Sequence, residues 1–597
     1  MLAGPIFSRE VLTTPRQFRH YLMRSGYVAL LFVLMYTAGQ ATFGWQQLRN
    51  IGDTARFGEL IFQLFCIVQI SLISFFALLF AAGNVAQEKD KETLLLLLMT
   101  DLRSRELVLG KLFSSLLSVA VLLLVSLPLF CFVHMLGGVS VNQLIWTFAI
   151  SVATSFVCGS WGSLIAFWRE KTFQTLALSV LGAVLFLGLL EAVIATAGVE
   201  SFVGSVAAWL NPFRALMSVL NPLNHFAGLE PIHASAWQTV LALSVLGILL
   251  NVVTIVRLRV WNPSRFVYHT GKNITKKETA EKEALEKVEE NLEEEAIQPA
   301  TNNQKTRDVW DKPILWREIC TRAYGRKMFI IKLAYLILAF FIGTMLFQSD
   351  EDAGLVLGMI SSSGFGFVVL SLMSLILINA QAVTSITSER DGKTLELLLV
   401  TDITAKEFIY GKIGGVFYNT KELILIPLAL MAYALFSQVI TLENYLLLTI
   451  SFLVLVAFVC TLGIHAGRTF ANSRGGIANS LGTVFFLFIG IFIFMLLLVE
   501  ARGSFMLQFQ SFLVFIVAGS IGLYASLTRN KPSNALTIAS ATLPMLTFYA
   551  ITSFLLSEPM ATMLAVIFAY GWTTVAMLIP AISEFDVALG HAAVNRE

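Results

Sequence analysis

The chain has 597 residues, of which 56% are hydrophobic and only 13% are charged. Soluble globular proteins carry about 25% charged residues, so this composition excludes that class. The formal net charge of +2 gives no reason to expect a nucleic-acid partner, because such proteins usually carry a strongly basic patch.

Apolar runs longer than about 18 residues recur along the chain, which is the length a helix needs to cross a bilayer core. The runs are continuously apolar, whereas strands of membrane barrels alternate. The predicted fold class is therefore an all-α polytopic membrane protein with about 12–14 transmembrane helices. In the first half, we expect spans at 26–45, 60–84, 111–136, 143–167, 174–197 and 237–259. In the second half, we expect spans at 328–347, 356–386, 413–437, 443–467 and 478–499, with further apolar runs at 508–527, 537–557 and 560–582.

A polar segment between the second and third spans occurs twice. Residues 88–111 read EKDKETLLLLLMTDLRSRELVLGK and residues 389–412 read ERDGKTLELLLVTDITAKEFIYGK. The offset is 301 residues without a gap, and 12 of the 24 positions are identical. An internal repeat of this kind predicts two copies of one structural unit. The Thr-Asp pairs at 100–101 and 401–402 are candidate N-caps for the helices that carry Glu106 and Glu407.

A second repeat lies upstream of each first span. The segment PIFSRE, with Arg9 and Glu10, resembles PILWRE, with Arg317 and Glu318. Each begins a mixed apolar and basic stretch, at 5–24 and 313–327, which is typical of a helix that lies in the membrane interface. An unstructured tail is the alternative.

The distribution of Lys and Arg predicts the orientation of the chain. These residues concentrate before span one, around the repeated segment, and after spans four and six, all of which fall on one side if the spans alternate. We therefore expect the N-terminus, both repeated segments and the central linker to be cytoplasmic. An even number of spans between the copies predicts a parallel repeat rather than an inverted one.

Composition also suggests the domain division. The linker contains KNITKKETAEKEALEKVEENLEEE at 272–295, which has few apolar residues to bury, so we expect a solvated helix or a disordered tether. The expected units are a first transmembrane unit, the charged cytoplasmic linker, a second transmembrane unit, and an additional apolar hairpin with a cytoplasmic tail. These units cover residues 1–260, 261–312, 313–527 and 528–597, respectively.

The pattern E-x-D-x-x-T-L-x-L-L-L-x-T-D, followed by E-x-x-x-G-K at the start of span three, resembles the ABC-2 family of ABC-transporter permeases. The resemblance covers both six-span halves and implies a fold like that of type V exporters. It implies a coupling helix between spans two and three, which docks into a cytoplasmic ATPase subunit. It also makes the upstream Arg-Glu elements resemble the family's connecting helices. The implied coupling residues are Glu88, Asp90, Thr93, Asp101, Glu106, Gly110 and Lys111 in the first copy, and Glu389, Asp391, Thr394, Asp402, Glu407, Gly411 and Lys412 in the second.

The chain departs from this family in carrying two units, so it should supply both halves of a translocation path. The resemblance implies an exporter in the inner (cytoplasmic) membrane with two separate ATPase subunits, which would hold ATP and Mg²⁺. Leu95 and Glu396 occupy the same position in the two copies, so the two docking surfaces should differ.

Neither Gly-Lys pair belongs to a phosphate-binding loop, which has the pattern G-x-x-x-x-G-K-[ST]. Arg105 and Leu112 replace the first Gly and the final Ser or Thr around Lys111, and Lys406 and Ile413 do so around Lys412. We therefore expect no catalytic residues and no cofactor in this chain. The histidines and the five cysteines lack the spacing of metal ligands, so no metal site is expected either.

Ionisable residues within spans are candidates for substrate contact, although the substrate is unknown. Glu191 lies near the outer end of span five, where snorkelling is the alternative reading. Lys421 and Glu422 lie in span three of the second half, unless that span begins later. Pro128 and Pro427 are predicted to kink the two third spans.

Two other functions compete with the permease. A secondary transporter with two parallel six-span halves also has a long central loop. It would place a Gly-x-x-x-Asp-Arg-type turn between spans two and three, which this chain lacks. A membrane-embedded enzyme would need clustered acids, His or Cys near the interface.

Overall fold

The computed structural model describes residues 7–9, 18–43, 51–90, 93–198, 201–220, 235–262, 310–320, 328–347, 362–391, 403–470, 473–501, 505–528 and 533–588. These residues are helical apart from short turns, and none of them forms a strand. The predicted fold class of an all-α polytopic membrane protein is confirmed. The linker at 263–309 lies outside the described residues.

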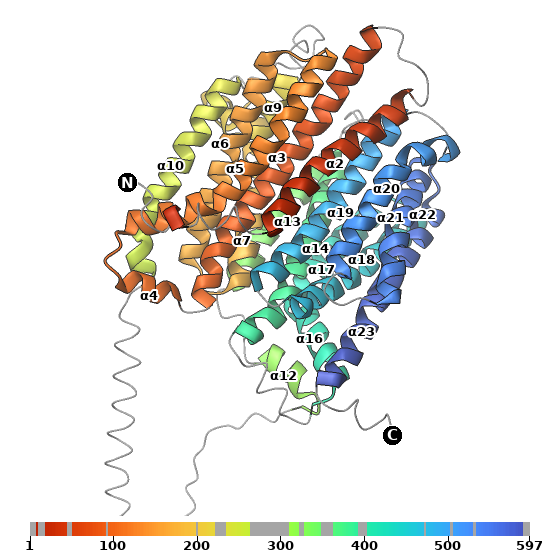
Figure 1. Cartoon of the computed structure of the whole chain (residues 1–597). Coiled ribbons are helices and arrows are strands. Elements are labelled where there is room, and N and C mark those ends of the chain that lie inside the picture. The colour runs from red at the N-terminus through yellow and green to blue at the C-terminus, as the bar shows by residue number, and fades with distance from the viewer. Residues whose placement is uncertain are drawn as a thin grey trace, which may run out of the picture.

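The helices form one large bundle (Figure 1). The first half contains α2 (Phe18–Phe43), α3 (Ile51–Asp90), α4 (Thr93–Met99), α5 (Ser104–Leu136), α6 (Val141–Trp168), α7 (Thr172–Ala197), α8 (Phe202–Leu210), α9 (Pro212–Leu220) and α10 (Ala236–Trp261). The second half contains α12 (Pro313–Cys320), α13 (Met328–Phe347), α14 (Ser362–Asp391), α16 (Ala405–Asn419), α17 (Lys421–Phe436), α18 (Leu442–Thr469), α19 (Ser473–Ala501), α20 (Phe505–Leu527), α21 (Asn534–Leu555), α22 (Pro559–Val566), the π-helical turn η3 (Ile567–Gly571) and α23 (Trp572–Ala588).

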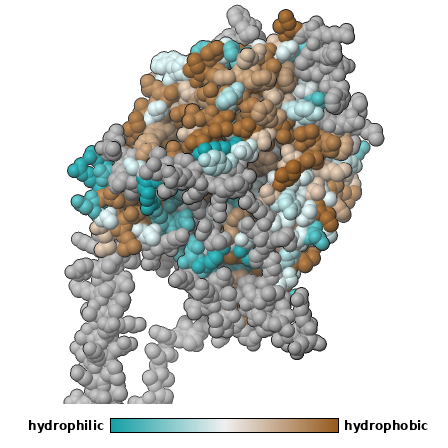
Figure 2. Space-filling model, in the orientation of Figure 1, coloured by the Kyte–Doolittle hydropathy of each residue, from teal (hydrophilic) through white to brown (hydrophobic). Residues whose placement is uncertain are grey.

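Each predicted span coincides with one of these helices or with a helix pair. Among the described residues, 10 helices are long and apolar enough to cross a membrane, or up to 12 if two bent pairs each count as one span. Figure 2 shows apolar side chains over most of the visible face, and hydrophilic ones gathered toward its lower part. The small helices α4 and α12 lie at this lower end, which we call the α4 end (Figure 1).

The third span of the second half is broken, and the break is not at the proline. Helices α16 and α17 meet at 56°, with Thr420 between them, seven residues before Pro427. The Thr420 hydroxyl donates to the Val416 carbonyl at 2.8 Å, and that carbonyl also accepts the Thr420 N–H at 2.9 Å. Such bonding of a side chain back to the helix competes with the regular backbone ladder and is associated with bends.

The helix packing extends the repeat beyond the segments that the sequence shows. In the first half, α10 packs along α6, where Asn251 donates to the Ser160 hydroxyl at 2.7 Å. In the second half, α22, η3 and α23 pack along α18, with the rings of Phe458 and Tyr570 5.0 Å apart. Helices α22 to α23 thus contact α18 as α10 contacts α6, and the division of the chain at residue 527 stays a prediction.

The two halves pack through an apolar core. Helix α3 contacts α19, where the Phe75 and Phe485 rings stack with centroids 4.1 Å apart. Helix α7 contacts α13 and α14, and α2 contacts α19 and α20. One buried cluster contains side chains from both halves, including Phe173 and Leu370. The described residues therefore form one body despite the long charged linker.

Candidate functional site

The candidate site is the α4 end of the bundle, where each repeated segment begins. In the first copy, α3 ends at Asp90, α4 occupies Thr93–Met99, and α5 begins at Ser104. A short helix therefore lies between spans two and three in this copy. Residues 392–402 lie outside the described residues, and with them the predicted site residues Thr394 and Asp402. Glu10 and the side chain of Asp90 also lie outside.

Helix α4 has one face on the bundle and one face away from it. Leu94 is buried in a small cluster with Leu107 of α5 and Leu258 of α10. Leu96 and Met99 are exposed, as are Thr93 and Asp101 at its two ends. A short helix that exposes large apolar side chains between polar groups has the character of a protein-docking surface.

The predicted N-caps are wrong in position. Thr100 donates to the Leu97 carbonyl at 2.6 Å and so belongs to the end of α4. The next helix begins at Ser104, and the Glu106 carboxylate accepts the N–H of Arg103 at 3.1 Å. In the second copy, Thr404 caps α16: its hydroxyl accepts the Glu407 N–H at 3.2 Å, and the Glu407 carboxylate accepts the Thr404 N–H at 3.1 Å. The glutamates act at the third helical position, as in a capping box, so the cap lies three residues before each of them.

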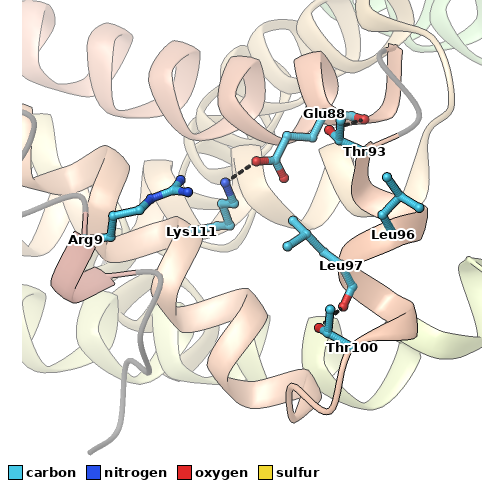
Figure 3. A pocket seen from close by; sticks show the side chains of 7 residues that line it. All are labelled: Arg9, Glu88, Thr93, Leu96, Leu97, Thr100 and Lys111. Carbon is cyan, nitrogen blue, oxygen red and sulfur yellow. Dashed lines mark hydrogen bonds and ion pairs between the residues drawn. The ribbon is translucent and has the colours of Figure 1, made fainter.

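An open pocket of about 580 Å³ lies beside α4 (Figure 3). At its centre, the Lys111 ammonium group at the start of span three pairs with the Glu88 carboxylate at the end of span two. Arg9 lies on the other side of Lys111, and the pocket is completed by residues of α4 and the turn after it. These remaining residues are Thr93, Leu96, Leu97 and Thr100.

The second half has a larger and more deeply buried charge network at the same place. The Lys412 ammonium group lies 2.5 Å from Glu318 Oε1 and 2.7 Å from Glu389 Oε1. Arg317 pairs with Glu389 and lies 3.8 Å from Glu318. Lys412 also donates to the Ser385 carbonyl at 3.2 Å. The network thus ties the upstream helix α12 to the end of span two and the start of span three.

Two glycines allow α12 to approach α16. A Cβ atom on Gly411 would lie 2.9 Å from Ile314, and one on Gly415 would lie 2.6 Å from the Glu318 side chain. The Gly-Lys pair of the second copy is therefore a packing element, in which Gly411 admits α12 and Lys412 binds its carboxylate. Gly110 is also buried.

A further pair of cations was not identified from the sequence. The Lys89 ammonium group donates to two carbonyls at the end of α6, that of Phe167 at 2.6 Å and that of Arg169 at 2.9 Å. A cation at a helix C-terminus satisfies carbonyls that lack partners and interacts favourably with the helix dipole. Burial lowers the pKa of the neighbouring Arg169 guanidinium, an effect that the charge of Glu170 opposes.

Arg390, at the position equivalent to Lys89, does the same for α18. Its Nη1 donates to the Gly467 carbonyl at 2.9 Å and also to that of Phe470. The offset of 301 residues holds for these cations and for the helix ends that they cap. In the sequence, these two cations could have been noticed because each repeated segment begins with Glu followed by a basic residue, at 88–89 and 389–390.

The remaining candidates are paired within the chain. At the opposite end of the bundle, Glu191 accepts two hydrogen bonds from Arg214, at 2.8 and 2.6 Å, and one from Asn211 at 2.6 Å. Arg214 belongs to α9, which meets α8 at 83°. Glu422 pairs with Lys332 at 2.6 Å. Asp391 and Glu407 lie near the start and end of the second repeated segment, where Glu407 is exposed.

The described residues at the α4 end give little support for metal binding or for acid–base catalysis. Among the described residues, no three His, Cys, Asp or Glu side chains gather as a metal site would require. The pocket in Figure 3 holds one carboxylate that is already paired with a lysine, which suits binding better than acid–base catalysis.

Comparison with known proteins supports a transport function. No curated protein matches the chain. Residues 46–256, which include the first repeated segment, match the family described as ABC-2 family transporter protein. Members of this family are membrane components of ABC transporters and pair with a cytoplasmic ABC ATPase subunit. Over this matched region, the chain is similar to the ABC-2 family of ABC-transporter permeases.

Proposed function

We propose that this chain is the permease of an ATP-driven exporter and that it supplies both halves of the translocation path. It sits in the inner membrane with its N-terminus and its α4 end in the cytoplasm. Two ATPase subunits dock at the segments 88–111 and 389–412, and they hold ATP and Mg²⁺. The placement of positive charge supports this orientation.

The observation that carries the proposal is helix α4. It lies between spans two and three at one end of the bundle, and its Leu96 and Met99 side chains are exposed there. Among the described residues, nothing covers these two apolar side chains. An ATPase groove that covered them would remove their apolar surface from water, which is favourable by roughly 25 cal/mol per Å².

The two docking surfaces are not equal in this proposal. The first upstream segment includes Arg9 beside an open pocket, whereas the second, α12, is held by the buried network around Lys412. A movement of the second ATPase would thus be passed directly from α16 to α12, because Gly411, Gly415 and Lys412 join the two helices.

The test uses two methionines near opposite ends of α5. Met99 precedes α5 and is 60% exposed, while Met135 lies in its last turn and is 83% exposed. We expect Met99→Glu to reduce the vanadate-sensitive ATP hydrolysis that co-purifies with the tagged chain from its native membrane by tenfold or more. This follows because an unpaired charge would be buried at the interface. The matched change Met135→Glu should leave that activity within twofold of wild type.

Equal effects of the two substitutions would show that α4 is not the docking helix. If no ATP hydrolysis co-purifies with the wild-type chain under conditions that preserve its monodisperse gel-filtration peak, the proposed pairing with ATPases is wrong.

A further inference from the structure

The first span of each half packs against helices of the other half. These two contact regions, which we call seams, differ in the helices that surround them. Helix α2 packs against α3, α5, α19 and α20. Helix α13 packs against α14, α17 and α7, which are the counterparts of the first three, and no further described helix packs along it. The insertion of α20 and α21 thus covers one seam, whereas no helix among the described residues covers the corresponding side of α13.

The burial patterns of α2 and α13 show which residues correspond. The buried positions of α2 are Tyr27, Leu31, Leu34 and Ala38, and those of α13 include Ile331, Tyr335, Leu338 and Ile342. The spacing of four, three and four residues is the same in both sets. Lys332 therefore corresponds to Val28. By the offset of the repeated segments, Glu422 corresponds to Val121.

The second half thus has an ion pair where the first half has two valines. Lys332 Nζ lies 2.6 Å from Glu422 Oε1, and the two side chains are 32% and 34% exposed. Glu422 Oε2 has no hydrogen-bond partner among the described residues. Lys421 follows the break in this span and lies over the Tyr418 ring at 4.6 Å. Among the described residues named here, two lysines accompany one glutamate.

Above this corner, α13 presents an apolar face. Phe329, Leu333, Leu336 and Phe340 are all exposed, and their spacing places them along one side of the helix. Lys332 lies about 6 Å along the axis from the first residue of α13, which is close enough to this helix end for its ammonium group to extend to a lipid headgroup there.

We propose that this corner binds one membrane lipid with an anionic headgroup. The headgroup contacts Lys332 and Lys421, and the acyl chains lie along the apolar face of α13. The lysines complement the anionic headgroup of such a lipid, and the uncovered apolar face of α13 complements its acyl chains. The first half lacks this pair of charges, because Val28 and Val121 stand at the corresponding positions.

The test places the purified full-length chain in phosphatidylcholine vesicles with a trace of photoactivatable phosphatidylglycerol. A diazirine near the headgroup end of the acyl chain records contacts, and mass spectrometry quantifies adducts on the peptides 328–347 and 18–43. We expect the phosphatidylglycerol probe to label 328–347 about fivefold more than a phosphatidylcholine probe with the same diazirine. The peptide 18–43 has Val28 in place of Lys332, so it should show a smaller preference and is the internal comparison.

The triple variant Lys332→Val, Lys421→Ala and Glu422→Val carries the residues of the first half and removes the ion pair together with the second lysine. It should label equally with both probes, whereas Lys332→Arg should keep the preference. Equal labelling of 328–347 by the two probes in the wild-type chain would overturn the proposal. So would a preference that survives in a well-folded triple variant. Competition by inorganic phosphate as strong as that by unlabelled phosphatidylglycerol would show a phosphate site rather than a lipid site.

Discussion

Lys412 and Lys111 occupy the same position in the two repeats, yet their surroundings differ. Lys412 is 1% exposed and contacts two carboxylates from two other helices, whereas Lys111 contacts one carboxylate that is 22% exposed. Removing one partner of a buried pair leaves a charge without compensation, which costs more than removing a partner near water. The two lysines should therefore differ in their contribution to stability.

We predict that Lys412→Met destabilises the chain by about 3–5 kcal/mol. The buried Glu318 and Glu389 would then lack their shared cation. Lys111→Met is the matched control and should cost less, because Glu88 is closer to solvent. Thermal unfolding followed by fluorescence-detected gel filtration measures both changes. Equal losses of thermal stability would contradict the difference in burial.

Because Glu88 and Glu389 pair with lysines of their own chain, a charge reversal at either position would affect the stability of the fold as well as any docking. From the sequence, both were expected to face an ATPase, and that docking role stays a prediction. In the structure, both carboxylates bind lysines of their own chain. We predict that Glu389→Lys lowers the amount of folded protein in the membrane, since it places an ammonium group against Lys412. Glu88→Lys should do so less, and Glu88→Lys with Lys111→Glu should restore the amount. Membrane abundance on immunoblots decides this, and normal abundance of Glu389→Lys would contradict it.

At the scale of elements, one glycine in each half sets how closely span four crosses span two. A Cβ atom on Gly162 would lie 2.7 Å from the Leu78 carbonyl oxygen, and one on Gly463 would lie 2.8 Å from the Asn379 oxygen. Both contacts obey the offset of 301 residues. Small residues that let helix backbones approach are a common basis of packing in membranes, where apolar burial gives little drive for association.

We predict that Gly162→Ala and Gly463→Ala each destabilise the bundle by about 1–3 kcal/mol, because the carbonyl on the facing helix must move away. Gly83 lies in α3 with nothing within 4 Å of its would-be Cβ, so Gly83→Ala is the control. It should be neutral or slightly stabilising, since Ala has the higher helix propensity. The midpoint of thermal unfolding checks all three, and a stabilising Gly463→Ala would refute the close crossing.

Hydrophobic length alone predicted the spans, since any continuous apolar run must be helical in a bilayer. The sequence could not show the break at Thr420, which depends on one hydroxyl bonding back to a helix carbonyl. Nor could it show that α22–α23 packs on α18 as α10 packs on α6, because apolar runs in lipid carry little information about their neighbours. In the site, the repeat identified Glu88, Glu389, Lys111 and Lys412, but not that they bind each other.

At the scale of the whole molecule, the halves are joined by packing rather than by the linker. We predict that protease cleavage between about 270 and 308 leaves them associated on gel filtration in mild detergent. The stacked Phe75 and Phe485 rings and the contacts of α7 with α13 and α14 support this expectation. Phe485→Ala is a useful companion variant, since it weakens the interface without touching the linker. Separation of the cleaved wild-type halves would show that the linker holds them together.

The direction of the last helices tests the orientation of the whole chain. In Figure 1, α22 lies toward the opposite end of the bundle, and α23 runs from there to the end where α16 lies. The contacts of α23 with α16 and α18 agree with this course. Glu558, just before α22, should therefore face outward if the α4 end is cytoplasmic. The segment between α20 and α21 contains Arg529 and Lys531, which the positive-inside rule places in the cytoplasm.

We predict that Glu558→Cys reacts with an impermeant thiol reagent added to intact cells, or to spheroplasts if an outer membrane is present. Asn530→Cys should react only after the membrane is permeabilised. Labelling of permeabilised cells controls for the intrinsic reactivity of each cysteine, and the unsubstituted chain controls for Cys131, which is exposed on α5. Reversed labelling of both positions would place the α4 end outside, where ATP-driven coupling through α4 could not occur. Protection of both would mean that the segment before α22 does not reach the outer surface, so α21 and α22–α23 would not both cross the membrane.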